Sequence, residues 1–203
     1  MRVMDMDMER LQKQFAFILE IDKEKSILRQ TLKSDGVSRE NDAEHAWHMA
    51  IMTLLLSEYA DEPIDVLRTI SMLLIHDLVE IDAGDTYAYD EKGKMTQRER
   101  ELAAADRVFG MLPGDQGRKL RALWDEFEAG GTPEARFAAA MDRIQPMMLN
   151  AATNGKKWKE NGVTLSKIMK RCSRLPETSP ALWAYTKENF IDPHVEMGNI
   201  KDE

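Results

Sequence analysis

The sequence predicts an all-α protein that folds as a single helical bundle. Apolar side chains recur at helical spacing along most of the 203 residues, beginning with Leu11, Phe15, Ile18 and Leu19. No segment alternates convincingly between apolar and polar side chains, as a half-buried strand would, and no repeat or linker interrupts the chain. We therefore expect one domain over residues 1–203, with its core at about 10–150 and C-terminal helices at 155–191 packed on that core.

Helical segments are expected to fill most of the chain before residue 80. The apolar spacing predicts helices at 11–19, at 21–28 as a continuation or a second helix, at 42–59 and at 61–78. Ser34-Asp35-Gly36 is the expected turn ahead of the 42–59 helix. Asp42 is the expected N-cap of that helix, because a short polar side chain there satisfies free backbone N–H groups.

The second half of the chain is expected to begin with a loop at 82–95, where two glycines and charged side chains interrupt the apolar pattern. Helices are predicted to follow at 96–111, 115–129, 133–152, 163–173 and 179–190. Proline and glycine punctuate the joins, as in Pro113-Gly114. Pro146 falls inside the 133–152 helix and predicts a kink or an early end there, since proline lacks a backbone N–H.

The charge balance and the cysteine content limit the classes of function. With 36 acidic and 28 basic side chains, the net charge of −8 disfavours binding to nucleic acid or to an anionic membrane. No stretch approaches the roughly 20 apolar residues of a membrane span, and the first residues do not resemble a signal peptide. The single cysteine, Cys172, excludes an intrachain disulfide and a cysteine-rich zinc site. We expect a cytoplasmic protein.

A metal site is the most specific expectation. His76 and Asp77 interrupt an apolar run, and burial of such an ionisable pair is costly unless a bound cation compensates for it. His45 lies at a helix start and Asp142 lies in another apolar helix, so four side chains of ligand type occupy three helical segments. Mixed nitrogen and oxygen ligands suit one divalent Mn, Fe, Co, Ni or Zn ion better than Ca²⁺. Such an ion polarises a phosphoryl oxygen or lowers the pKa of bound water.

Each of these features also has a structural explanation. A lone His-Asp pair often satisfies a buried polar group, and Asp142-Arg143 alone fits a surface ion pair. Residues 42–45 alone are typical of a helix start. Their combination in apolar surroundings favours the metal site. Glu80 follows His76 by four residues and Asp77 by three, so a continuous helix would direct all three side chains toward one cavity.

The order His45, His76-Asp77, Asp142 resembles the H…HD…D pattern of the HD-domain metal-dependent phosphohydrolases, an all-α superfamily. The resemblance spans roughly residues 10–150 and is nearest to the 5′-deoxynucleotidase branch. Three stretches carry it: Glu40-Asn41-Asp42-Ala43-Glu44-His45; His76-Asp77-Leu78-Val79-Glu80 with Gly84-Asp85; and Leu123-Trp124-Asp125-Glu126-Phe127 with Ala140-Met141-Asp142.

The resemblance implies a role for six residues. The metal ligands would be His45, His76, Asp77 and Asp142, and the acid/base pair for the attacking water and the departing 5′-oxygen would be Glu80 and Asp85. Dinuclear relatives typically carry a further histidine shortly after the HD pair, whereas Leu78-Val79-Glu80-Ile81 follows it here, which favours a single metal. Ile81 also departs from the HD-x-x-E-D pattern of alarmone hydrolases.

Two arginines are candidates for binding the substrate phosphate. Arg29 lies about where the nucleotidase branch has an arginine, although Gln30 stands in place of the usual tryptophan or threonine. Arg39 is the second candidate, because a guanidinium suits a phosphate geometrically. The basic residues of 156–174 form either a solvated face or a region that attracts anions toward the site.

Together these features predict a phosphomonoesterase that acts on (deoxy)nucleoside 5′-monophosphates. The family resemblance and the abundant apolar helix surface favour a homodimer. The alternatives are a regulatory nucleotide-binding HD protein with little turnover, a hydrolase of another nucleotide such as an alarmone, and an all-α structural protein whose polar cluster is merely paired.

Overall fold

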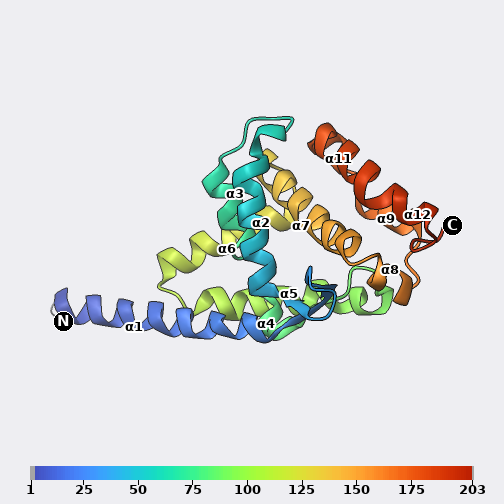
Figure 1. The fold of residues 1–203 in the computed structure, drawn as a ribbon. Coiled ribbons are helices and arrows are strands. Elements are labelled where there is room, and N and C mark those ends of the chain that lie inside the picture. Colours follow the sequence, from blue (N-terminus) through green and yellow to red (C-terminus); the bar gives the residue numbers. More distant parts are fainter. Residues whose placement is uncertain (1–2, 203) are drawn as a thin grey trace.

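Helices dominate the computed structural model, which describes residues 3–202 (Figure 1). The predicted all-α class is confirmed, since the strands within these residues are limited to two short segments, β1 (Leu28–Leu32) and β2 (Arg39–Asn41). No helix within residues 3–202 combines the length and the apolar character that a membrane crossing requires.

The hairpin of β1 and β2 departs from the expectation that the chain holds no strand. Its strands are antiparallel, and the expected turn at 34–36 joins them. The Asp35 carboxylate stabilises this turn by accepting hydrogen bonds from the backbone N–H groups of Val37 and Ser38. Three consecutive polar residues occupy the middle of β1, so the strand shows no alternating apolar pattern by which it could be recognised.

The hairpin is preceded by α1 (Val3–Ile21) and the 3₁₀ helix η1 (Asp22–Ser26). Figure 1 shows α1 along one edge of the molecule, with its N-terminal end extending beyond the other helices. The expected helix at 21–28 is therefore replaced by one 3₁₀ turn and the start of β1.

Helix α2 (Asp42–Leu56) begins one residue earlier than the predicted cap implied, because Asn41 and not Asp42 is its N-cap. The Asn41 side chain accepts a hydrogen bond from the backbone N–H of Glu44 at 2.9 Å, and the Glu44 carboxylate accepts one from the N–H of Asn41 at 3.1 Å. This reciprocal pair is a capping box. Since Asn41 performs the capping, the Asp42 side chain is free to point inward, where it is completely buried. The 3₁₀ helix η2 (Ser57–Tyr59) follows α2.

The single helix predicted at 61–78 is wrong. Helix α3 (Val66–Leu73), capped by Asp65, ends before the His-Asp pair, residues 74–79 form consecutive turns, and α4 (Glu80–Ala83) begins afterwards. From Ile75 to Glu80 the backbone hydrogen bonds reach three residues back, as from Glu80 N–H to Asp77 O at 2.8 Å. The carbonyl of His76 instead accepts a hydrogen bond from the Trp124 indole N–H at 3.1 Å. A distant tryptophan thus compensates for the helical bond that is lost.

Three long helices complete the central part of the fold. They are α5 (Glu91–Gly110), α6 (Gly114–Ala129) and α7 (Pro133–Ala152). Because Asp90 caps α5, the loop predicted at 82–95 shortens to residues 84–90. Helix α7 continues past Pro146 to Ala152, so of the predicted kink or early end the early end does not occur. Helices α2, α3 and α6 all pack on α7, around buried side chains such as Met49, Met72 and Met141.

Short helices form the C-terminal part. They are α8 (Lys156–Glu160), α9 (Leu165–Arg171), α10 (Leu175–Thr178), α11 (Pro180–Thr186), the π-helical turn η3 (Lys187–Ile191) and α12 (Asp192–Glu196). Figure 1 places α9, α11 and α12 together beside α7. The buried side chains of Trp158, Ile168 and Ile191 belong to the same hydrophobic cluster as the α7 core. This shared cluster supports the proposal that the chain forms one domain.

Candidate metal centre

The four predicted ligands come from three separate elements and meet beside α7. His45 is on α2, His76 and Asp77 are in the 74–79 turns, and Asp142 is on α7. His45 Nε2 lies 3.2 Å from Asp142 Oδ1, and His76 Nε2 lies 3.1 Å from Asp77 Oδ1 and 4.0 Å from Asp142 Oδ1. Three of them, His45, His76 and Asp142, offer ligand atoms that all lie within 4.8 Å of one another.

The hydrogen bonding of His76 leaves the nitrogen that faces this group available. His76 Nδ1 lies 2.9 Å from the carbonyl oxygen of Leu73, and a carbonyl can only accept, so Nδ1 carries the proton. His76 Nε2 is buried and has no hydrogen-bond partner among the described residues. A buried nitrogen lone pair close to two carboxylates is the donor arrangement that a divalent transition metal requires. The side chains therefore fit the metal that the sequence predicts.

Electrostatics support the same conclusion. Although burial acts to lower the pKa of His76, the carboxylate of Asp77 raises it to about 9, with Asp142 contributing. Burial acts to raise the pKa of Asp142, yet the hydrogen bond to His45 and the charge of Arg171 hold it well below its usual range. Without a bound cation, protonated His76 supplies positive charge beside the carboxylates of Asp77 and Asp142. Acid and metal are thus expected to compete for this group.

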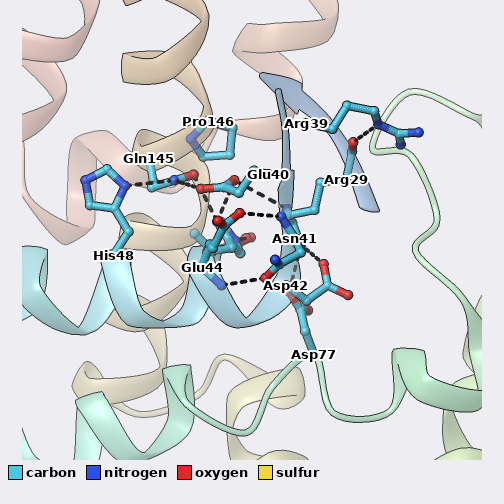
Figure 2. Close-up of polar contacts among 12 residues, drawn as sticks. Arg29, Arg39, Glu40, Asn41, Asp42, Glu44, His48, Asp77, Gln145 and Pro146 are labelled. Carbon is cyan, nitrogen blue, oxygen red and sulfur yellow. Dashed lines mark hydrogen bonds and ion pairs between the residues drawn. The ribbon is translucent and has the colours of Figure 1, made fainter. Parts of the chain in front are cut away.

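Arg29 on β1 contacts one of the candidate ligands, Asp77, together with Asp42 (Figure 2). Its Nη1 donates hydrogen bonds to Asp77 Oδ2 at 2.7 Å and to Asp42 Oδ1 at 3.2 Å. Burial acts to lower the pKa of Arg29, but the carboxylates of Asp77, Asp142 and Asp42 raise it above its ordinary value. The guanidinium therefore stays charged at the edge of the candidate site.

Arg39, the second predicted phosphate ligand, is not brought to the site with the others. Its guanidinium donates hydrogen bonds to the backbone carbonyls of Arg29 and Leu28, as Figure 2 shows for Arg29. Among the residues that the structure describes, the lining of the site's cavity includes Arg29 but not Arg39. By bonding to the backbone of strand β1, Arg39 helps to hold Arg29 in position.

A cavity of about 220 Å³ is lined by three of the four candidate ligands, His76, Asp77 and Asp142. Its wall includes the aromatic side chains of Tyr87, Tyr89 and Phe127. Three basic side chains also line it, Arg143 from α7 and Lys157 and Arg171 from the C-terminal segment. The rings of Tyr87 and Tyr89 meet edge to face, with centroids 5.4 Å apart. Acidic side chains, Glu101 and Glu128, line another part of the wall. The cavity therefore combines apolar surface with charges of both signs.

Glu80 and Asp85, the predicted acid/base pair, both line this cavity. Burial and the carboxylates of Asp77 and Asp42 raise the pKa of Glu80 to about 12, and burial also raises the pKa of Asp85. Gly84 separates α4 from Asp85 and has a φ of +74°, a conformation that favours glycine. The chain turns at this glycine, where α4 ends, and the turn brings Asp85 to the wall of the cavity.

Several buried polar residues near the ligands were not predicted from the sequence to belong to the site. Asp42 has a carboxylate oxygen within 4.8 Å of ligand atoms of Asp77 and Glu80. Glu24 on η1 is buried, and one of its oxygens, Oε1, has no hydrogen-bond partner in the described part of the chain. Glu40 and Gln145 hydrogen-bond to each other behind His45. Two of them had a usable sequence signal: Gln145 follows Asp142 by three residues and Asp42 precedes His45 by three, so each shares a helical face with a predicted ligand.

Fold and site together define the class: a helical protein with a candidate centre of two imidazoles and two carboxylates for a divalent metal. A family model described as "HD domain" matches residues 21–183. The chain belongs to the HD-domain family. This match, together with the relatives described next, confirms the predicted resemblance to the HD-domain phosphohydrolases.

The relatives include 5′-deoxynucleotidases and a solved bacterial structure. The chain is 31% identical over 125 residues to 5′-deoxynucleotidase HDDC2 of Xenopus laevis, covering 62% of this chain and 58% of that protein. It is 29% identical over 113 residues to the Homo sapiens protein of the same name, covering 56% of this chain and 53% of that protein. The chain thus spans about half the length of the curated relatives that it matches.

A crystal structure gives a match over nearly the whole chain. It is that of a predicted metal-dependent phosphohydrolase from Magnetospirillum magnetotacticum MS-1. The TM-score is 0.89 at 51% sequence identity, and the match covers 94% of this chain and 95% of that one. The helical arrangement described above, C-terminal part included, therefore has a close counterpart.

Proposed function

We propose that this protein is a metal-dependent phosphohydrolase that releases phosphate from (deoxy)nucleoside 5′-monophosphates. The observation that carries the proposal is the meeting of His45, His76, Asp77 and Asp142, of which the last three line a cavity that Arg29 also lines. The names of the relatives, 5′-deoxynucleotidase and predicted metal-dependent phosphohydrolase, support the reaction class. The predicted substrate is therefore a small nucleotide.

The four ligands would hold one divalent transition metal, with Mn, Co, Fe, Ni and Zn as the candidates. When bound, such an ion polarises a phosphoryl oxygen and makes water a stronger nucleophile at neutral pH. The protein's own contribution begins with Arg29, whose charged guanidinium matches the geometry of a phosphate. Because Arg29 already lies 2.7 Å from Asp77, it would place the phosphate directly beside the ligands.

Glu80 and Asp85 are assigned to proton transfer. Glu80 holds its proton tightly, since burial and the carboxylates of Asp77 and Asp42 raise its pKa, so we assign it as the acid that protonates the departing 5′-oxygen. Burial raises the pKa of Asp85 and the carboxylate of Asp77 adds to this rise, whereas the positive charges of Arg29 and Arg39 oppose it. Asp85 is accordingly the group that accepts a proton from the attacking water.

The rest of the cavity suits a nucleotide. Arg143, Lys157 and Arg171 supply positive charge for an anionic substrate, which the overall charge of −8 would otherwise repel. Lys157 and Arg171 belong to the basic segment at 156–174, so this segment contributes to the cavity in addition to forming solvated surface. The pair Tyr87–Tyr89 offers aromatic surface for a nucleoside.

The proposal is tested by measuring phosphate release from a panel of nucleotides with Mn²⁺ or Co²⁺ added. Wild type is expected to hydrolyse one or more 5′-monophosphates, and Asp77→Ala is expected to abolish this activity. Glu80→Gln is expected to lower kcat by on the order of 10²–10⁴-fold, the usual contribution of a general acid. Asp125→Ala is the matched control, because Asp125 is an exposed carboxylate that pairs with Arg121 on the surface of α6.

Each other outcome assigns the site differently. Equal phosphate release by wild type and Asp77→Ala would refute the proposal. Tight nucleotide binding without turnover would instead indicate a regulatory nucleotide-binding protein, and a preference for guanosine tetraphosphate would indicate an alarmone hydrolase. A cytoplasmic location remains part of the proposal, and the abundance of soluble nucleotides there is consistent with it.

A further inference from the structure

Gln145 is a completely buried amide on α7, one helical turn after Asp142 (Figure 2). Its Oε1 lies 2.9 Å from His45 Nδ1. Its Nε2 lies 2.5 Å from Glu40 Oε1 and 3.1 Å from His48 Nδ1. A buried amide without partners would be costly, whereas here both ends of the amide are bonded, and one of them to a proposed metal ligand.

The carboxylate of Glu40 determines which way the amide faces. A carboxylate has no proton to donate, so the atom of Gln145 that approaches it must be the donor, Nε2. The reversed amide would place two acceptor oxygens against each other at hydrogen-bond distance inside the protein. Glu40 is only 2% exposed, so water cannot readily separate the two groups. The amide oxygen is therefore held toward His45.

The amide orientation in turn fixes the protonation of His45. Because Gln145 Oε1 can only accept, His45 Nδ1 must carry a proton, and its Nε2 keeps a lone pair. That Nε2 lies 3.2 Å from Asp142 Oδ1, at the candidate metal site. With the amide reversed, Gln145 would donate to Nδ1, the proton would move to Nε2, and the lone pair needed by a metal would be lost.

The two histidine ligands are controlled by different kinds of acceptor. His76 Nδ1 donates to the backbone carbonyl of Leu73, which cannot reverse its polarity. His45 Nδ1 donates instead to a side-chain amide at 2.9 Å, with Glu40 Oε2 farther away at 3.5 Å, and the two ends of an amide are nearly equal in size and opposite in function. His45 therefore needs a second residue to orient its acceptor, and Glu40 occupies that place.

We propose that Gln145, oriented by Glu40, is the positioning residue that keeps the Nε2 lone pair of His45 directed at the metal. This inference rests on the metal site of the proposed function. Outer partners of metal-bound histidines typically change metal affinity by about 10–100-fold when they are removed. Gln145→Leu, which keeps the side-chain volume but has no acceptor, is expected to weaken Mn²⁺ binding by about that factor.

The first measurement is Mn²⁺ affinity by isothermal titration calorimetry on the full chain. Leu149→Ala is the control, because Leu149 is a buried residue of the same helix whose loss disturbs packing without touching His45. The control is expected to bind Mn²⁺ within about threefold of wild type. Equal affinity of wild type and Gln145→Leu would overturn the inference alone. If wild type itself bound no Mn²⁺, the metal site would be refuted and this inference with it.

The second measurement reads the protonation of His45 directly. In ¹⁵N spectra of the Zn²⁺-loaded protein, His45 is expected to show a protonated Nδ1 and a metal-bound Nε2. In Gln145→Leu, the Nδ1 proton is expected to exchange with solvent faster, because it has lost its acceptor. An unchanged Nδ1 signal and exchange rate in the variant would contradict the proposal, whatever the stability of the protein.

An exchange of the two groups gives the sharpest test. In Gln145→Glu alone, two carboxyl groups face each other at positions 40 and 145. In Glu40→Gln alone, the carboxylate that orients the Gln145 amide is missing, so this amide can reverse. Each single variant is therefore expected to weaken Mn²⁺ binding. The double variant Glu40→Gln, Gln145→Glu places a carboxylate beside His45 and an amide donor behind it, which restores the order of donors and acceptors. Recovery of Mn²⁺ affinity to within about threefold of wild type supports the proposal. Additive losses in the double variant would overturn it.

Discussion

At the scale of single residues, the site is defined by an excess of buried acid. Glu24, Asp42, Asp77 and Glu80 are all buried close to Arg29 along the chain or in contact with the site, and the carboxylates of Asp77 and Asp42 raise the pKa of both Glu24 and Glu80. One guanidinium cannot neutralise four carboxylates, so protons remain where the charge is not balanced. This imbalance explains why some of these acids have raised pKa values and why a divalent cation would stabilise the group.

Glu24 is not a proposed ligand, so its pKa can be used to measure the excess of negative charge without altering the metal site. Burial, with the carboxylates of Asp77 and Asp42, raises its pKa from 4.5 to about 7. Because the folded protein binds this proton more tightly, the carboxyl contributes stability that is complete below pH 4.5 and is lost as the pH rises through 7. Glu24→Gln removes this loss and is expected to stabilise the metal-free protein above pH 8 by at most about 3 kcal/mol.

Thermal unfolding of the metal-free protein at several pH values checks this prediction. The gain in Tm from Glu24→Gln should grow between about pH 5 and pH 8, in step with ionisation of the wild-type carboxyl. Glu58→Gln, at an exposed position on η2, should show no such trend. A gain that is the same at both ends of the pH range would contradict the assignment of the effect to a buried charge.

At the scale of elements, periodicity predicted the long helices well and the connections poorly. The segments predicted at 115–129 and 133–152 agree with α6 and α7 within one residue, because their apolar positions follow one helical face. The break after α3 could not be predicted, since apolar residues continue through it and the compensating Trp124 lies 48 residues away. The polar strand β1 is likewise formed by pairing with β2, which local sequence does not reveal.

The candidate site divides in the same way. The side chains expected at the metal could be named because their types are unusual in an apolar setting. The roles of Gln145 and Glu40 could not be assigned, because they depend on which end of the Gln145 amide faces His45, and the sequence does not show this. The contrast between Arg29 and Arg39 also required the hairpin, since only its register shows which arginine reaches the carboxylates.

The capping box of α2 links local structure to the site. Asn41→Ala removes a capping hydrogen bond and is expected to lower the free energy of unfolding by about 1 kcal/mol. If the first turn of α2 frays, the free energy of Mn²⁺ binding is expected to fall by more than this. His45 and Asp42 both lie in this turn region. Chemical denaturation and Mn²⁺ titration measure the two effects, and Asn41→Ser, which keeps a capping oxygen, should restore both. Normal values for Asn41→Ala would show that the box does not organise the site.

At the scale of the whole molecule, apolar surface remains uncovered on the helices that carry the site. Helix α2 exposes Trp47, Leu54 and Leu55, with fractional exposures of 63%, 57% and 67%, and the adjacent α3 exposes Leu67 at 73%. Monomeric proteins rarely leave such large side chains together in water. This surface supports the proposed homodimer, whose subunits would meet on the outer face of these helices.

Light scattering coupled to gel filtration tests the dimer. The wild-type mass is expected to be twice the 23.3 kDa of one chain, and Leu55→Glu is expected to shift it toward the monomer. Met95→Glu changes an equally apolar but separate position on α5, 85% exposed, and should leave the mass unchanged. A wild-type protein that elutes as a monomer at tens of micromolar would exclude this assembly.

The contact of His45 with Asp142 joins two points of the chain that are 97 residues apart. On the proposal that one ion binds both, that ion is a cross-link, and it encloses most of the helical core in a loop. A covalent bridge around a loop of this length restricts the unfolded chain by about 4–5 kcal/mol of entropy, and a coordinate bond acts on the same quantity. A protein with one cysteine would then acquire, through its proposed metal centre, the kind of stabilisation that secreted proteins obtain from disulfides.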